Sequence, residues 1–152
     1  MMIRRYSRAL TAVAVISASI ALAAYQLSQF AVDTSLGHWY SGARGYASAL
    51  ENQQRTGKPI ALFFHTDWCA SCKNLRETVL STRKFEGFAQ NLIPVKINPE
   101  TGVEERKIAD KYGVRGYPTF LIVTDKFKTI TPIRTRLNMP PEKFIASCEK
   151  AL

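Results

Sequence analysis

Helical spacing of apolar residues covers much of this chain beyond residue 45. It predicts five helices, at residues 46–56, around Leu75–Leu80, around Phe85–Leu92, at 103–112 and from Pro140 onward. Gly57 and Pro59 follow the first of them in the order expected after a helix C-terminus, and Gly113 ends the fourth.

Four shorter runs predict strands, at residues 60–64, 92–97, 119–123 and 128–134. The first run is apolar throughout, as in a strand buried on both faces. The early strands alternate with helices, which implies parallel pairing, and the last two are close enough for a hairpin turning at Asp125-Lys126. The sequence therefore predicts an α/β fold with a mixed central β-sheet flanked by helices.

The first 32 residues follow neither pattern. Three arginines lie within the first eight residues, and the run from Ala9 to Val32 carries no charge. We expect a targeting segment, either a signal peptide cleaved near Ala21–Ala23 or a membrane anchor. With either, the basic end stays in the cytoplasm and the following domain is exported, to the periplasm or another extracytoplasmic space.

Composition and charge narrow the class of protein. Residues 33–45 contain Gly and Ser without periodicity and predict a linker or extension, followed by one domain at 46–152. The net charge of +9 comes from scattered basic residues, so we expect a basic surface and no nucleic-acid partner.

Candidate chemistry begins at "WCASCK", directly after the apolar strand 60–64. Cys69 lies at a predicted helix N-terminus, where unpaired N–H groups and the helix dipole favour a thiolate. Cys72, one turn further on, is placed to attack a mixed disulfide on Cys69. We expect an exposed nucleophile at Cys69, a more buried resolving thiol at Cys72, Trp68 covering one side of the site, and a positive charge from Lys73.

Other interpretations of the cysteines remain. A disulfide across so short a loop stabilises little, and a structural zinc site needs about four ligands. A copper site formed by Cys69, Cys72 and His65 stays open. Cys148 lies on the apolar face of the last helix, where we expect a buried free thiol.

A second motif, Gly116-Tyr117-Pro118-Thr119, precedes the strand 119–123. A proline that lies directly before a buried strand, two residues after a glycine, is a candidate for a cis peptide bond. If this loop folds against Cys69, the Tyr117 backbone can pair with an extended substrate segment by strand addition. A plain loop proline is the alternative.

With these motifs the chain resembles the thioredoxin family over roughly residues 45–150. The resemblance rests on Trp68–Lys73, Lys96–Asn98 and Tyr112–Thr119, in this order and spacing. Gly57–Pro59 and Asp67–Cys69 further resemble the exported C-terminal domain of bacterial membrane thiol-disulfide interchange reductases. The resemblance implies a thioredoxin fold, a redox-active disulfide between Cys69 and Cys72, cis-Pro118, and substrate contacts at Trp68, Tyr117 and Pro118.

The chain departs from the family at two places. Ala70-Ser71 replaces the usual Gly-Pro between the cysteines, so the resemblance does not fix the direction of exchange. Phe63 occupies the position of a buried aspartate that is thought to help move the proton of the second cysteine, although the neighbouring lysine is kept as Lys96. We therefore expect slow resolution by Cys72, or proton transfer through water.

The main hypothesis is an exported thiol-disulfide oxidoreductase, a reductase or isomerase acting on protein disulfides. It requires a thiol-disulfide electron donor, a membrane contact if the N-terminal segment is uncleaved, and no cofactor, since no nucleotide or flavin motif is present. Two alternatives remain: a copper metallochaperone using Cys69, Cys72 and His65, and a thioredoxin-like adaptor whose cysteines are incidental.

Overall fold

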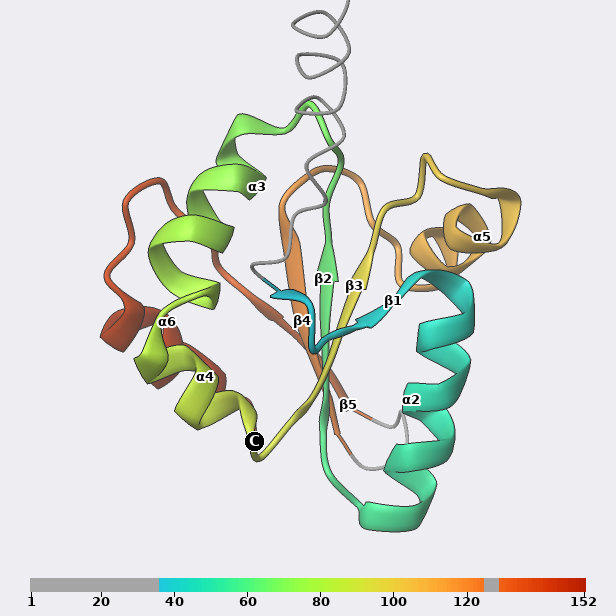
Figure 1. Ribbon diagram of the computed structural model, residues 1–152, viewed down its shortest axis with the longest axis horizontal. Helices are drawn as coiled ribbons and strands as arrows, with labels where there is room; N and C mark the ends of the chain where they lie inside the picture. The colour runs from blue at the N-terminus through green and yellow to red at the C-terminus, as the bar shows by residue number, and fades with distance from the viewer. Residues whose placement is uncertain (1–35, 125–128) are drawn as a thin grey trace, which may run out of the picture. The chain divides into compact units, whose positions relative to one another are not determined.

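A mixed β-sheet forms the centre of the domain in the computed structural model, which describes residues 36–124 and 129–152 (Figure 1). Across these residues the strand order is β1-β3-β2-β4-β5. Strands β1, β3 and β2 run parallel, whereas β4 is antiparallel to β2 and β5 to β4. The strands are β1 (Tyr40–Ser41), β2 (Ile60–Phe64), β3 (Ile93–Ile97), β4 (Thr119–Thr124) and β5 (Thr129–Ile133). The predicted mixed sheet is confirmed.

Strand β2 lies in the middle of this sheet, and all five of its residues are buried. It has hydrogen-bonded neighbours on both edges, so Leu62 lies opposite Val95 of β3 and Leu121 of β4. Successive side chains point to opposite faces of a strand. One face of β2 therefore presents Ala61 and Phe63, and the other presents Ile60, Leu62 and Phe64, each to a separate apolar cluster. The expectation of a strand buried on both faces is confirmed.

Helices cover both faces of the sheet, as Figure 1 shows. One face carries α2 (Gly42–Thr56) and α5 (Val103–Lys111). The other carries α3 (Ala70–Leu75), a π-helical turn η2 (Arg76–Leu80), α4 (Arg83–Ala89) and α6 (Pro141–Glu149). Helix α2 ends at Gly57, whose φ of 70° lies in the left-handed region that glycine adopts without strain. Gly113, with a φ of 64°, follows α5 in the same way.

The segment expected as a linker, 33–45, is instead part of the folded domain from residue 36 onward. Strand β1 pairs with β3, and α2 begins at Gly42, four residues before the expected start. Leu36 and Trp39 are buried, and the Trp39 ring packs against Phe63 and Phe85. The linker prediction is wrong here because a two-residue strand is too short to show a period of two.

Several expectations lie outside the described residues. The targeting segment at 1–32 and the turn at Asp125-Lys126 are among them. In the described part of the chain, no helix is both long enough and apolar enough to cross a membrane.

Trp39 tests whether the segment 36–41 belongs to the core. Its side chain is 4% exposed and stacks on Phe85 with ring centroids 6.1 Å apart. We expect Trp39→Ala to lower the free energy of unfolding by about 3–5 kcal/mol, since it removes a buried aromatic side chain and leaves a cavity. Urea unfolding of the full chain, followed by far-UV circular dichroism, measures this loss.

The chain provides a matched control in its other tryptophan. Trp68 lies on the surface, so Trp68→Ala should cost less than about 1 kcal/mol. Similar small losses for both variants would mean that the segment containing Trp39 does not contribute to the core.

Candidate active site

Cys69 and Cys72 form a disulfide at the point where β2 gives way to α3. The two sulfurs are 2.05 Å apart, and the Cα atoms are 5.2 Å apart. Cys69 is the N-cap of α3, and its sulfur accepts a hydrogen bond from the backbone N–H of Cys72 at 3.1 Å. The expected placement of Cys69 at a helix N-terminus is confirmed, and the Cys72 N–H of that terminus is shared between the Cys69 sulfur and the Cys69 carbonyl oxygen.

The two cysteine residues differ in solvent exposure less than expected. Cys69 is 6% exposed and Cys72 is 1% exposed, so Cys72 is the more buried residue, as predicted. The expectation of an exposed Cys69 is wrong for this disulfide form. The bond to Cys72 holds the Cys69 sulfur against the end of α3, where both residues join the apolar cluster around Phe63 and Leu75.

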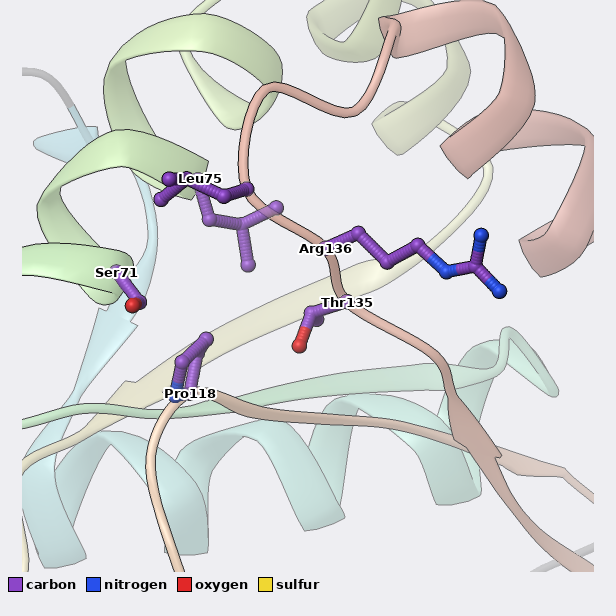
Figure 2. Close-up of a pocket in the computed structure, with 6 residues that line it drawn as sticks. Ser71, Leu75, Pro118, Thr135 and Arg136 are labelled. Atoms are coloured by element: carbon purple, nitrogen blue, oxygen red, sulfur yellow. The ribbon is translucent and has the colours of Figure 1, made fainter.

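The Pro118 loop lies beside this disulfide. The peptide bond between Tyr117 and Pro118 is cis, as predicted. Pro118 and Ser71, the residue that precedes Cys72, line a common groove of about 130 Å³ (Figure 2). The other lining residues are Leu75, Thr135, Arg136 and Leu137. The fold thus brings the predicted proline motif to the predicted dithiol motif.

Trp68 and Tyr117 meet on the surface next to the disulfide. Their rings are in edge-to-face contact, with centroids 6.3 Å apart, and Trp68 remains 70% exposed. The indole N–H of Trp68 donates to both carboxylate oxygens of Glu100, at 3.1 and 3.0 Å. Glu100 therefore fixes the orientation of an exposed aromatic ring. The sequence analysis did not identify Glu100, although its position three residues after the end of β3 was a signal that it lies at this edge of the sheet.

A lysine and a buried phenylalanine lie next to the two cysteines. Lys73 supplies a positive charge one residue after Cys72, but its ammonium lies 3.9 Å from the Glu77 carboxylate. Phe63 is fully buried in the cluster that contains both cysteines, and it lies opposite half-buried Lys96 in the β2–β3 register. Phe63 therefore packs in the core and cannot accept a proton from Cys72. That Cys72 attacks the mixed disulfide slowly stays a prediction.

The three residues considered for copper do not form a ligand cluster. Over residues 36–124 and 129–152, no group of three or more His, Cys, Asp or Glu side chains is arranged to hold a metal ion. The two sulfurs are bonded to each other, and the His65 ring stacks on Phe63 with centroids 5.2 Å apart. The geometry gives no support to the copper alternative.

Cys148 is a free thiol on α6, buried as predicted. Burial raises its pKa from 9.0 to about 12, and the neighbouring Glu149 carboxylate adds to the shift. Because only the thiolate reacts readily, we expect Cys148 to react slowly at neutral pH.

Alkylation tests this difference between the cysteines. After reduction of the native full chain at pH 8, we expect iodoacetamide to modify Cys69 rapidly and Cys148 only after unfolding, because its folded-state pKa of about 12 keeps the thiol protonated. Mass spectrometry of timed samples measures both rates, with a urea-unfolded sample as the control. Equal rates at Cys69 and Cys148 in the native chain would contradict this assignment.

Comparison with known families identifies the class of this protein. The family model described as a thioredoxin-like domain matches residues 46–152. The chain belongs to this thioredoxin-like family, and its sheet order and flanking helices are those of a thioredoxin fold, as predicted.

Among curated proteins, the chain is 28% identical over 95 residues to the disulfide bond reductase DsbH of Chlamydia pneumoniae, covering 56% of this chain and 57% of the relative. It is 26% identical over 105 residues to the thiol:disulfide interchange protein DsbD of Ralstonia nicotianae, covering 68% of this chain but only 17% of that relative. Among solved structures, the oxidised C-terminal domain of DsbD from Neisseria meningitidis superposes with a TM-score of 0.60 at 22% identity, covering 72% of this chain and 95% of the domain.

These comparisons confirm the predicted resemblance to thioredoxin-like proteins and to the DsbD C-terminal domain. The two relatives are named as thiol-disulfide enzymes, and the predicted Cys-x-x-Cys pair is present in this chain as a disulfide. The chain spans little more than half of DsbH and a small part of DsbD.

Proposed function

We propose that this chain is an exported thiol-disulfide oxidoreductase that reduces or isomerises protein disulfides through Cys69 and Cys72. The observation that carries the proposal is the Cys69–Cys72 disulfide at the start of α3, beside the cis-Pro118 loop. Two relatives that bear the names disulfide bond reductase and thiol:disulfide interchange protein support it, and the first of these names favours the reducing direction.

The exchange runs in two steps from the reduced dithiol. The Cys69 thiolate attacks one sulfur of a substrate disulfide, forms a mixed disulfide, and releases the other substrate sulfur as a thiolate. Cys72, as a thiolate, then attacks the Cys69 sulfur and releases the second substrate thiol. Two electrons have passed to the substrate, and Cys69 and Cys72 are left in the disulfide that the structure contains.

The helix terminus stabilises the attacking group. The backbone N–H of Cys72 lies 3.1 Å from the Cys69 sulfur, and the dipole of α3 places partial positive charge at the same end. Both favour the thiolate of Cys69 over its thiol once the disulfide is reduced.

Trp68, Tyr117 and Pro118 would bind the substrate segment. An extended chain beside Pro118 can pair with the Tyr117 backbone by strand addition, which recognises any sequence through main-chain hydrogen bonds. The exposed Trp68 ring, held by Glu100 and Tyr117, offers an apolar contact with one fixed orientation.

The remaining assignments complete the proposal. Residues 1–32 act as a signal peptide or membrane anchor, and the folded domain from residue 36 onward works outside the cytoplasm. A thiol-disulfide partner protein returns two electrons to the Cys69–Cys72 disulfide after each turnover.

A trapping experiment tests the assignment of the two cysteines. We expect reduced Cys72→Ser to accumulate a stable mixed disulfide with an oxidised test protein such as insulin, because the second attack is lost. Cys69→Ser should form none, since the attacking sulfur is gone. Non-reducing gels and mass spectrometry of the adduct measure both, with Cys148→Ala as a control expected to match the unmodified chain.

Two other outcomes would contradict the proposed roles. Trapping through Cys69→Ser and not through Cys72→Ser would reverse the two roles. No adduct with any variant, together with partner binding that survives the double change Cys69→Ala and Cys72→Ala, would make the chain a thioredoxin-like adaptor.

A further inference from the structure

Among the described residues that line the groove next to the disulfide, one has a charged side chain. Ser71 and Leu75 of α3, Pro118, and the loop residues Thr135 and Leu137 are uncharged, whereas Arg136 carries a full positive charge. Figure 2 shows the Arg136 side chain extending from this loop away from Ser71 and Pro118, so its guanidinium lies outside the groove, on the other side of the loop. A segment that binds beside Pro118 and continues across this loop would pass the charge.

The loop that carries Arg136 is fixed to α3. The Asn74 side-chain amide donates to the Asn138 side-chain oxygen at 3.0 Å, and the Asn138 backbone N–H donates to the Asn74 side-chain oxygen at 3.0 Å. Asn138 has a φ of 53°, in the left-handed region that asparagine adopts more readily than most residues. These two bonds hold the loop beside the helix that begins with the cysteines, so the backbone of Arg136 has a defined place at the groove.

The charge of Arg136 is open to a partner. Its side chain is exposed, and no carboxylate forms an ion pair with it over residues 36–124 and 129–152. Lys73, which directly follows Cys72, is already paired with Glu77. Leu137, next to Arg136, is 66% exposed and adds an apolar contact.

We propose that Arg136 makes this chain prefer substrate segments with an acidic side chain within a few residues of the attacked cysteine. The proposal rests on the proposed function and names its substrate class more narrowly, as disulfide-bonded segments with adjacent Asp or Glu. The guanidinium can bind a carboxylate through two parallel hydrogen bonds, which gives it a geometric preference that a lysine lacks. In an extended segment alternate side chains share one face, so an acidic residue can reach Arg136 while the cysteine lies at Cys69.

The expected effect is modest because the pair would be exposed to solvent. An exposed ion pair changes binding by about two- to fivefold, and added salt reduces the effect. Arg136 is therefore a specificity residue that biases substrate choice and takes no part in the sulfur chemistry.

The test uses three peptides that differ only in the residues flanking one disulfide-bonded cysteine, which are Glu, Gln or Lys. The cysteine is joined to a small chromogenic thiol whose release reports the reaction. Full-length chain in mild detergent is reduced, freed of reductant and mixed with each peptide, and single-turnover rates are measured at low and high salt. The variants are Arg136→Gln and the matched control Arg134→Gln, which makes the same charge change at an exposed residue outside the groove.

We expect the unmodified chain to reduce the Glu peptide about two- to fivefold faster than the Gln peptide, and the Lys peptide more slowly than either. Arg136→Gln should bring the Glu-to-Gln ratio to near one, and Arg134→Gln should keep the ratio of the unmodified chain. The proposal is overturned if Arg136→Gln keeps the preference, or if Arg134→Gln lowers it equally, since the general basic surface would then be its source.

The same experiment distinguishes a failure of the Arg136 preference from a failure of the proposed function. Equal reduction of all three peptides by the unmodified chain contradicts the role of Arg136 and leaves the proposed function intact. No reduction of any peptide contradicts the proposed function, and the preference fails with it.

Discussion

The central constraint in this structure is a fully buried strand that can leave the core only at its end. All backbone partners of β2 come from β3 and β4, and its five side chains fill the apolar clusters on both faces. The chain therefore reaches the surface after the end of β2, at Asp67 and Trp68, and Cys69 then caps α3, which begins at Ala70. This position gives one cysteine sulfur an N–H donor at 3.1 Å while most of the disulfide stays buried.

Strand register brings the other parts of the site to the same edge of the sheet. Phe64 lies opposite Thr119 of β4, and Pro118 precedes Thr119, so the cis-proline lies at the end of β2 from which the cysteines emerge. On the other side Phe64 lies opposite Ile97 of β3, and the loop after Ile97 carries Glu100 to Trp68. Three loops distant in sequence thus converge because of one register, as expected where ligands bind beyond the carboxyl ends of parallel strands.

Local patterns predicted the parts of the molecule whose signals are local. The apolar run 60–64, the glycines that end α2 and α5, and the cysteines at a helix start all follow from neighbouring residues. Strand β1 could not be predicted from local patterns, because its two residues acquire their structure only by pairing with β3. The bonds between Asn74 and Asn138 join residues 64 positions apart, so no local pattern indicated that the loop with Arg136 would border the groove. The exposure of Cys69 was overestimated for the same reason, since the tertiary packing of the disulfide sets it.

The reduction potential of the Cys69–Cys72 pair tests the central claim most directly. The full chain would be equilibrated in glutathione buffers of graded ratio, quenched by alkylation, and counted for free thiols by mass, with Cys148→Ala removing the third thiol from the count. A reducing or isomerising dithiol should show a reversible two-electron couple at or below about −180 mV. A pair that shows no reversible couple, or one near the roughly −120 mV of a strong oxidant, would contradict the proposed function.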